Sequence, residues 1–178
     1  SEVESFNSND EYGFSSAGSK SPHTFLAGWS AARAGAQAGT AIRIACRRET
    51  GLANYSARAD SPFLSGLKEK KTVSLDIRYD YSMNREGKPK ISQTVYFGYI
   101  TTPENPKSGD DTGTFPTSFT VNETTGSYTN INHTASTTLS GVSAPLRLSW
   151  RTVPETNWGA NNNTCWLYID NIKVKIKK

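Results

Sequence analysis

The sequence predicts an all-β fold, a two-sheet antiparallel jelly-roll β-sandwich, formed by one domain over residues 1–178. Alternating or β-branched runs bounded by turn residues recur along the whole chain. Ser, Thr, Asn and Gly make the chain polar, since charged residues are only 20% and the mean hydropathy is −0.58. The hydrophobic fraction of 35% is still enough to form a single core.

The expected strands follow one another along the chain. The clearest run is 71–81, where Val73, Leu75, Ile77, Tyr79 and Tyr81 share one face and polar residues share the other. This pattern predicts a strand with one buried face. The full set of expected strands is Val3–Phe6, Thr40–Arg47, Lys71–Tyr81, Ile91–Thr101, Thr117–Val121, Ser127–His133, Pro145–Thr152 and Cys165–Ile176.

The alternation of the last strand slips near Asp170 and Asn171, which predicts a β-bulge there. Residues 30–39 are rich in Ala, but Gly35 and Gly39 oppose a helix and no larger apolar residue gives it a face to bury. We expect a loop over these residues. Proline, glycine and asparagine likewise predict loops over 103–116 and 155–164.

Charge and cysteine content narrow the possible partners. The pI of 9.1 comes without a long basic stripe, so nucleic acid is not an expected partner. No apolar run approaches the ~20 residues of a membrane-spanning helix, and neither a signal peptide nor an initiator Met is present. The chain starts at Ser1 as though trimmed, so we expect an extracytoplasmic domain whose targeting segment was removed; a cytoplasmic domain would have the same features. Cys46 and Cys165 lie in two expected strands, and whether they are bridged stays open.

The sequence contains no recognisable catalytic motif. His23 and His133 come without a Gly-x-Ser-x-Gly elbow, and each is better explained as a surface or turn residue. Two carboxylates would suffice for glycoside hydrolysis, but Asp76 and Asp80 lie on the outer face of a strand. Asp110 and its neighbour lie in an expected loop. We therefore expect no enzyme.

Aromatic and amide residues outside strand interiors are the candidate ligand contacts. Sugars pack their CH faces on aromatic rings, and their hydroxyls bond to arginine and amide groups. Trp158 stands in a polar loop beside Asn161, where exposing a tryptophan is costly unless it binds something. It could equally anchor the loop to the core. Arg48 and Tyr55 complete the candidate ligand-binding set.

Oxygen ligands at the two ends of the chain make a structural calcium site plausible. Calcium prefers carboxylate, amide and carbonyl oxygens. Glu4 and Asn7 lie at the first strand and Asp170 in the last, so these oxygens would converge if the two strands pair antiparallel. The alternative is that these side chains are simply solvated.

Several segments together resemble the galactose-binding-like, jelly-roll carbohydrate-binding modules, particularly those in surface or secreted proteins of Bacteroidetes. These segments, in chain order, are Glu4–Phe6, Gly28–Trp29, Gly39–Ile44 with Arg47–Arg48, Ser61–Leu64 and Trp166–Val174. The resemblance spans the whole chain and implies a structural calcium between the opening and closing strands. Where those modules commonly have Phe-Glu, this chain has Phe6-Asn7. Their sugar-binding residues vary too much to be carried over.

We therefore expect a non-catalytic carbohydrate-binding or carbohydrate-binding-like module of a secreted protein or cell-surface lipoprotein, with a glycan or polysaccharide as its partner. The alternative is a structural or adhesive domain of a larger cell-surface protein, contacting other domains and no small ligand. A polysaccharide-active hydrolase or lyase is the least favoured alternative. The fold alone does not decide among these functions.

Overall fold

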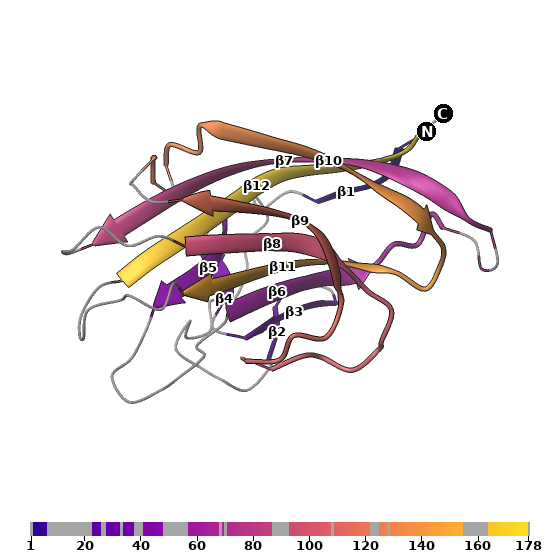
Figure 1. The fold of residues 1–178 in the computed structure, drawn as a ribbon, viewed down its shortest axis with the longest axis horizontal. Coiled ribbons are helices and arrows are strands. Elements are labelled where there is room, and N and C mark those ends of the chain that lie inside the picture. The colour runs from indigo at the N-terminus through magenta and orange to yellow at the C-terminus, as the bar shows by residue number, and fades with distance from the viewer. Residues whose placement is uncertain are drawn as a thin grey trace.

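A computed structural model describes residues 2–6, 23–25, 28–32, 34–37, 41–47, 57–67, 69, 71–86, 93–107, 109–121, 125–127, 129–154 and 164–177. The described residues form two antiparallel sheets that pack face to face as a β-sandwich (Figure 1). None of them belongs to a helix long and apolar enough to cross a membrane.

Sheet A contains the longest strands. Its order is β10 (His133–Val142), β7 (Val73–Glu86), β12 (Thr164–Ile176), β5 (Ala41–Arg47) and β4 (Ala34–Gln37), and β1 (Glu2–Phe6) also pairs with β12. Strand β12 pairs with β7 along its length, while its other edge is shared by β5 and β1. The first and last strands therefore pair antiparallel.

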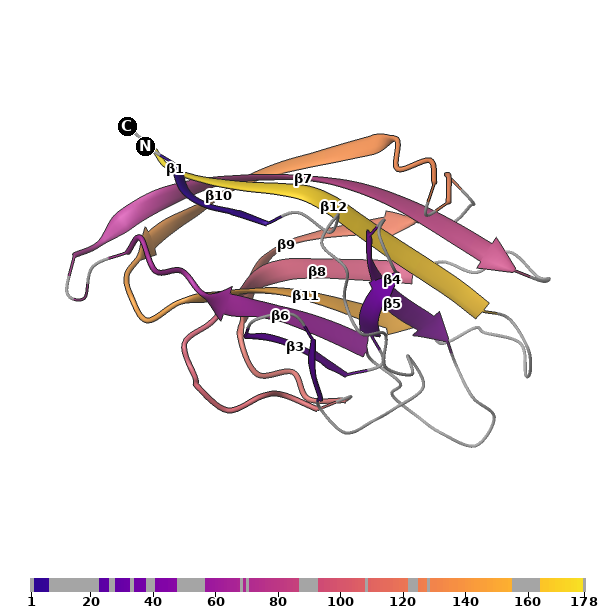
Figure 2. The ribbon, with the colours of Figure 1, turned by 180° about the vertical axis from the view of Figure 1, so that it is seen from behind.

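Sheet B lies below the long strands β10, β7 and β12 of sheet A in Figure 1, and Figure 2 shows the sandwich from behind. Its order is β2 (His23–Phe25), β3 (Trp29–Ala32), β6 (Ala57–Phe63), β11 (Arg147–Pro154), β8 (Gln93–Ile100) and β9 (Thr114–Val121). Consecutive strands alternate between the sheets from β5 to β8 and from β9 to β12. This alternation agrees with the predicted jelly roll.

Aromatic residues fill the space between the sheets. Trp150 of β11 is fully buried, with ring centroids 4.9 Å from Phe97, 5.5 Å from Tyr79 and 6.1 Å from Trp29. Tyr79 belongs to sheet A and the other three rings to sheet B. Burial raises the pKa of the Tyr79 hydroxyl well above its usual value. The aromatic cluster thus joins the two layers.

Some expected elements are wrong. Residues 30–39 were expected to be a loop, but β3 and β4 lie there, because Ala31, Ala32 and Ala34 are fully buried and small side chains suffice at these positions. Strand β6 was not expected at all. The strand expected at Ser127–His133 is also wrong, since only an isolated bridge forms there and β10 begins at His133.

The expected bulge in the last strand is confirmed. The register of β12 against β7 shifts between Asp170 and Lys173, and Asn171 adopts a left-handed φ of 52°. Asparagine is one of the few residues that enter this region at low cost. The bulge keeps Ile169 and Ile172 both in the core although they are three positions apart, an odd spacing that would otherwise place them on opposite faces.

The two cysteines lie directly opposite each other in β5 and β12. Opposed residues of antiparallel strands have Cα atoms about 4.5–5.5 Å apart, within the ~4.4–6.8 Å that a disulfide spans. We expect Cys46 and Cys165 to form an intramolecular disulfide under oxidising conditions and to raise the melting temperature, because the crosslink restricts the unfolded chain. Thiol titration of the denatured protein and thermal melts with and without reductant measure both effects.

The Cys46→Ala/Cys165→Ala double variant is the control and should melt at one temperature with or without reductant. If two thiols can still be titrated after mild oxidation, Cys46 and Cys165 do not form a disulfide despite lying opposite each other.

Candidate ligand-binding face of sheet B

The central strands of sheet B carry charged residues on the face that points away from the core. Arg58 lies opposite Arg151 and Asp60 lies opposite Ser149 in the register of β6 and β11. Directly opposed residues of antiparallel strands lie on the same face of a sheet. The intervening Ala59 and Trp150 belong to the core, so these four polar residues lie on the outer face.

Arg58 and Asp60 form a buried bidentate ion pair. Arg58 Nε donates to Asp60 Oδ2 at 3.0 Å and Nη2 donates to Oδ1 at 2.8 Å, with side chains only 1% and 0% exposed. Ser149 Oγ donates to Asp60 Oδ1 at 2.6 Å and accepts from Arg58 Nη2 at 2.9 Å. Because burying an unpaired charge is costly, each of these groups depends on the others.

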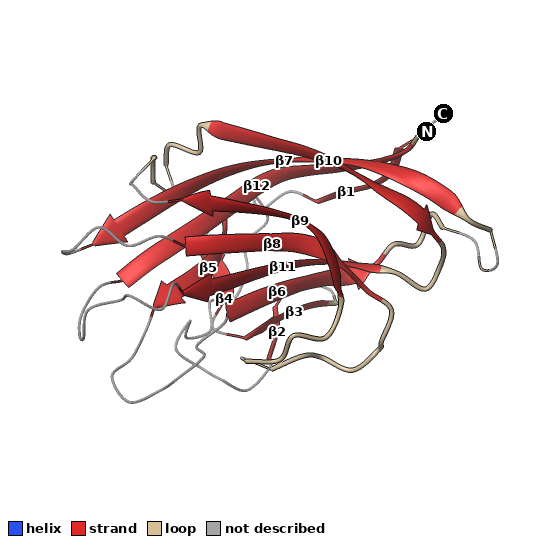
Figure 3. Cartoon of the chain, in the orientation of Figure 1, coloured by secondary structure: helices blue, strands red, loops and turns tan. Residues whose placement is uncertain are grey.

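The connection between β8 and β9 folds back over this network (Figure 3). Arg58 Nη1 donates to the carbonyl of Asp110 and Nη2 to the carbonyl of Thr112, each at 3.0 Å. The Asp110 carboxylate accepts from the backbone N–H of Thr112 at 2.9 Å and from its hydroxyl at 2.5 Å. These bonds, mainly that from the Thr112 hydroxyl, hold the pKa of Asp110 below its usual value, and the charge of Arg58 adds to the effect.

Gly98 allows this connection to return so closely to the sheet. A Cβ atom at position 98 would lie 1.8 Å from the carbonyl oxygen of Thr114 and 2.8 Å from the Cα of Phe115. The register of β8 against β9 also shifts between Phe97 and Tyr99. The glycine therefore brings Phe115 onto the outer face of the sheet.

Arg151 lies beside two neighbouring aromatic rings on this face. Its guanidinium carbon is 5.7 Å from the ring centroid of Tyr96 and 5.8 Å from that of Phe115, and the two rings are 6.4 Å apart. The side chain is half-buried, and its Nε is buried without a hydrogen-bond partner in the described part of the chain. Burial, followed by the charge of Arg58, lowers the pKa of Arg151. Arg151 thus places donors beside two apolar ring surfaces.

A second arginine extends the face toward the start of β11. Arg147 Nε donates to the carbonyl of Ser61 at 2.8 Å, and its guanidinium carbon is 5.6 Å from the ring centroid of Phe63. Phe63 is 40% exposed, which is unusual for a large apolar side chain in the described part of the chain. Arginine paired with an aromatic ring therefore occurs twice along β11.

The ligand-binding residues expected from the sequence are not among those that the structure describes. Trp158, Asn161, Arg48 and Tyr55 all fall outside the described residues. The strand ends that flank their segments do lie together, since Arg47 is opposite Thr164 and Ala57 is opposite Thr152. The glycan contacts expected in these segments stay a prediction.

The residues expected to bind calcium are only partly described. Asp170 lies directly opposite Asp80 of β7, and its Oδ1 accepts from the backbone N–H of Asn171 at 2.8 Å. Glu4 lies opposite Val174 in the register, and Asn7 falls outside the described residues. Within the described ranges, no three or more His, Cys, Asp and Glu residues gather in a way that could hold a metal ion.

Comparison with known proteins adds a structural likeness. No protein-family model matches the chain, and no curated protein is significantly similar to it. Among solved structures, the chain is similar to a carbohydrate-binding module, TmCBM61, solved in complex with β-1,4-galactotriose. The TM-score is 0.32 with 13% sequence identity, and the match covers 80% of this chain and 74% of that one.

The buried ion pair provides a test of how sheet B is built. We expect Asp60→Ala to lower the free energy of unfolding by about 3–5 kcal/mol, because Arg58 would stay buried without its counterion. Urea unfolding followed by tryptophan fluorescence measures the change. The control is Asp111→Ala, an exposed position on the connection that covers the pair, which should change stability by about 0.5 kcal/mol or less. Equal effects of the two variants would contradict the arrangement.

Proposed function

We propose that this domain is a non-catalytic carbohydrate-binding module of a secreted or surface-anchored protein, and that the outer face of sheet B contacts the glycan. The observation that carries the proposal is the guanidinium of Arg151 beside the neighbouring rings of Tyr96 and Phe115. Ring surfaces suit the apolar CH faces of a sugar, and guanidinium donors suit its hydroxyl oxygens. This combination supports saccharide binding better than binding of a purely apolar ligand.

The network beneath the face supports the same function. Arg58 is held by bonds to Asp60, Ser149 and the covering connection, so the groups around Arg151 have fixed positions before a ligand arrives. A rigid face loses less conformational entropy on binding than a mobile one. The buried Asp60 carboxylate is occupied by Arg58 and Ser149, which favours a supporting role over acid–base chemistry.

Glycan binding can be measured directly with a glycan array and with calorimetry on each glycan that binds. We expect Arg151→Ala to weaken the affinity at least tenfold, about 1.4 kcal/mol, because it removes donors and a ring contact at once. Lys71→Ala removes an exposed positive charge that precedes β7 and serves as the control. Its affinity should equal that of the unmodified domain.

Trp158→Ala separates the two candidate surfaces. If it abolishes binding while Arg151→Ala has no effect, the module function stands but the sheet B face is the wrong site. Binding to no glycan at all would remove the proposal and leave a structural or adhesive domain.

We also propose a structural calcium ion near Asp170. The register that places Asp170 opposite Asp80 supports this, because like charges opposed across two strands repel each other and a cation relieves that repulsion. We expect calcium to raise the melting temperature and a chelator to reverse the rise, since an ion bound only by the folded state stabilises it. In Asp170→Asn the response to calcium should be smaller. A melting temperature that changes with neither calcium nor chelator would show that no calcium ion stabilises the folded domain.

A further inference from the structure

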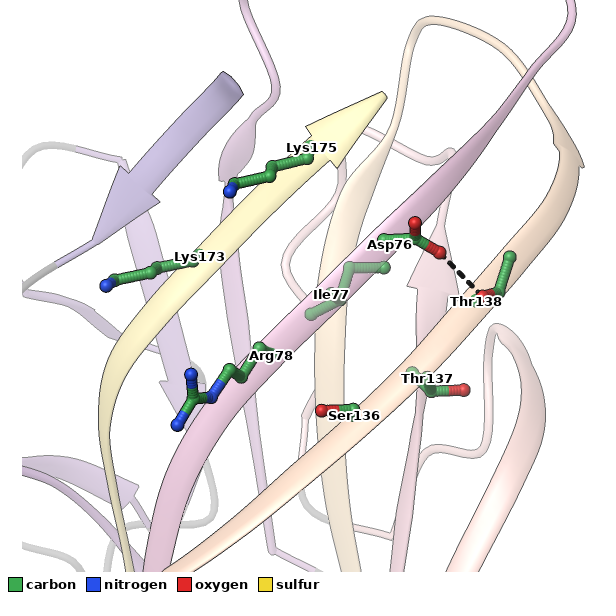
Figure 4. Close-up of a pocket in the computed structure, with 8 residues that line it drawn as sticks. All are labelled: Asp76, Ile77, Arg78, Ser136, Thr137, Thr138, Lys173 and Lys175. Atoms are coloured by element: carbon green, nitrogen blue, oxygen red, sulfur yellow. Dashed lines mark hydrogen bonds between the residues drawn. The ribbon is translucent and has the colours of Figure 1, made fainter. Parts of the chain in front are cut away.

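The outer face of sheet A has a hollow of about 360 Å³ across β10, β7 and β12 (Figure 4). Two rows of directly opposed residues cross it. One row joins Ser136, Arg78 and Lys173, and the other joins Thr138, Asp76 and Lys175. All six residues are exposed, so the hollow is open to a ligand from solvent.

The positive charges of this hollow are not neutralised by its carboxylates. Lys173 lies directly opposite Arg78, and like charges in this position destabilise a sheet. No ion pair joins either residue, or Lys175, to a carboxylate in the described part of the chain. Figure 4 shows the three cationic side chains directed away from Asp76, whose carboxylate instead accepts from the hydroxyl of Thr138 at 2.7 Å.

The neighbouring acidic residues do not lie between Arg78 and Lys173 in the strand register. Asp80, next on the same face of β7, accepts from the hydroxyl of Thr134 at 2.8 Å and from Asn171 Nδ2 at 2.9 Å. Glu2 of β1 lies opposite Lys175 in the register, whereas Lys173 lies opposite Ser5. An incoming anion would therefore meet Arg78 and Lys173 first.

The rest of the lining favours a saccharide among the possible anions. Ser136, Thr138 and the Asp76 carboxylate offer hydrogen-bonding oxygens to sugar hydroxyls, beside the cations. None of the described residues that line the hollow is aromatic, so among them the bases of a nucleic acid would find no ring to stack on. Ile77, the aliphatic residue among the described lining, is buried in the core and offers a membrane no apolar surface.

We propose that this hollow binds an acidic polysaccharide, with a carboxylate or sulfate group between Arg78 and Lys173. Arginine and lysine both bind such anions, and the bound charge would relieve the repulsion between the two side chains. This second site lies on the opposite side of the sandwich from Arg151 and is independent of the glycan site proposed on sheet B.

Binding to polygalacturonate and to heparin tests the proposal and distinguishes carboxylate from sulfate recognition. We expect Arg78→Gln/Lys173→Gln to weaken binding at least tenfold and Arg78→Lys to weaken it much less. Binding should be lost near 1 M salt, where the Debye length is about 3 Å. The melting temperature of the double variant should equal or exceed that of the unmodified domain, because the repulsion is removed.

Control ligands and variants make the test decisive. Dextran supplies a neutral polysaccharide and double-stranded DNA supplies another polyanion. DNA bound as tightly as the acidic glycans would overturn the proposal, as would the absence of binding to either acidic glycan. Arg151→Ala should leave acidic glycan binding intact. If that variant abolishes it, the acidic glycan binds sheet B, and the inference about sheet A is wrong whatever the function of sheet B.

Discussion

The packing of Trp150 between the sheets fixes the position of β11, on which the outer face of sheet B depends. Trp150 contacts Tyr79 of sheet A as well as Phe97 of its own sheet. Because side chains alternate along a strand, fixing Trp150 inward places Ser149 and Arg151 outward. A shift of one residue would turn the arginine into the core and expose the tryptophan. The aromatic core therefore determines which polar groups are available for binding.

The ion pair beneath that face is better explained by positioning than by stability. Burying Arg58 and Asp60 costs desolvation energy that their mutual attraction offsets only when every hydrogen bond is made. Here Arg58 donates to a carboxylate, a hydroxyl and two backbone carbonyls. A pair of apolar residues could fill the same space, but it could not hold the carbonyls of Asp110 and Thr112. The network thus fixes the connection that covers the ion pair.

The sequence predicted those parts of the fold in which apolar residues follow the strand period. Strand β7 shows this, since Leu75, Ile77 and Tyr79 are buried as expected and the strand continues beyond Tyr81 to Glu86. Strand β6 shows the opposite case, because its largest buried side chain is Arg58 and its core positions are alanines. Hydrophobic periodicity cannot reveal a strand of this kind.

The candidate sites were less predictable than the fold for a related reason. Arg58 and Asp60 are far from Arg151 in sequence, and only the pairing of β6 with β11 brings them together. The local signal of this site was the alternation of alanine with charged residues in 57–60. The same alternation is equally typical of a strand whose charged side chains are simply solvated. The sequence predicts a strand around Tyr96 and a loop around Phe115. The bulge that places Phe115 on the outer face depends on backbone contacts at Gly98, which the sequence pattern does not reveal.

The two outer faces differ in a way that affects how each would bind. On sheet B the charged groups are buried or half-buried and fixed by hydrogen bonds, so specificity would come from shape and from donors in fixed positions. On sheet A the cations are exposed and surrounded by water, so attraction there is long-ranged but screened by salt. A polysaccharide long enough to contact both faces would be attracted by sheet A and selected by sheet B. Because the core separates the two faces, either set of residues can change without disturbing the other.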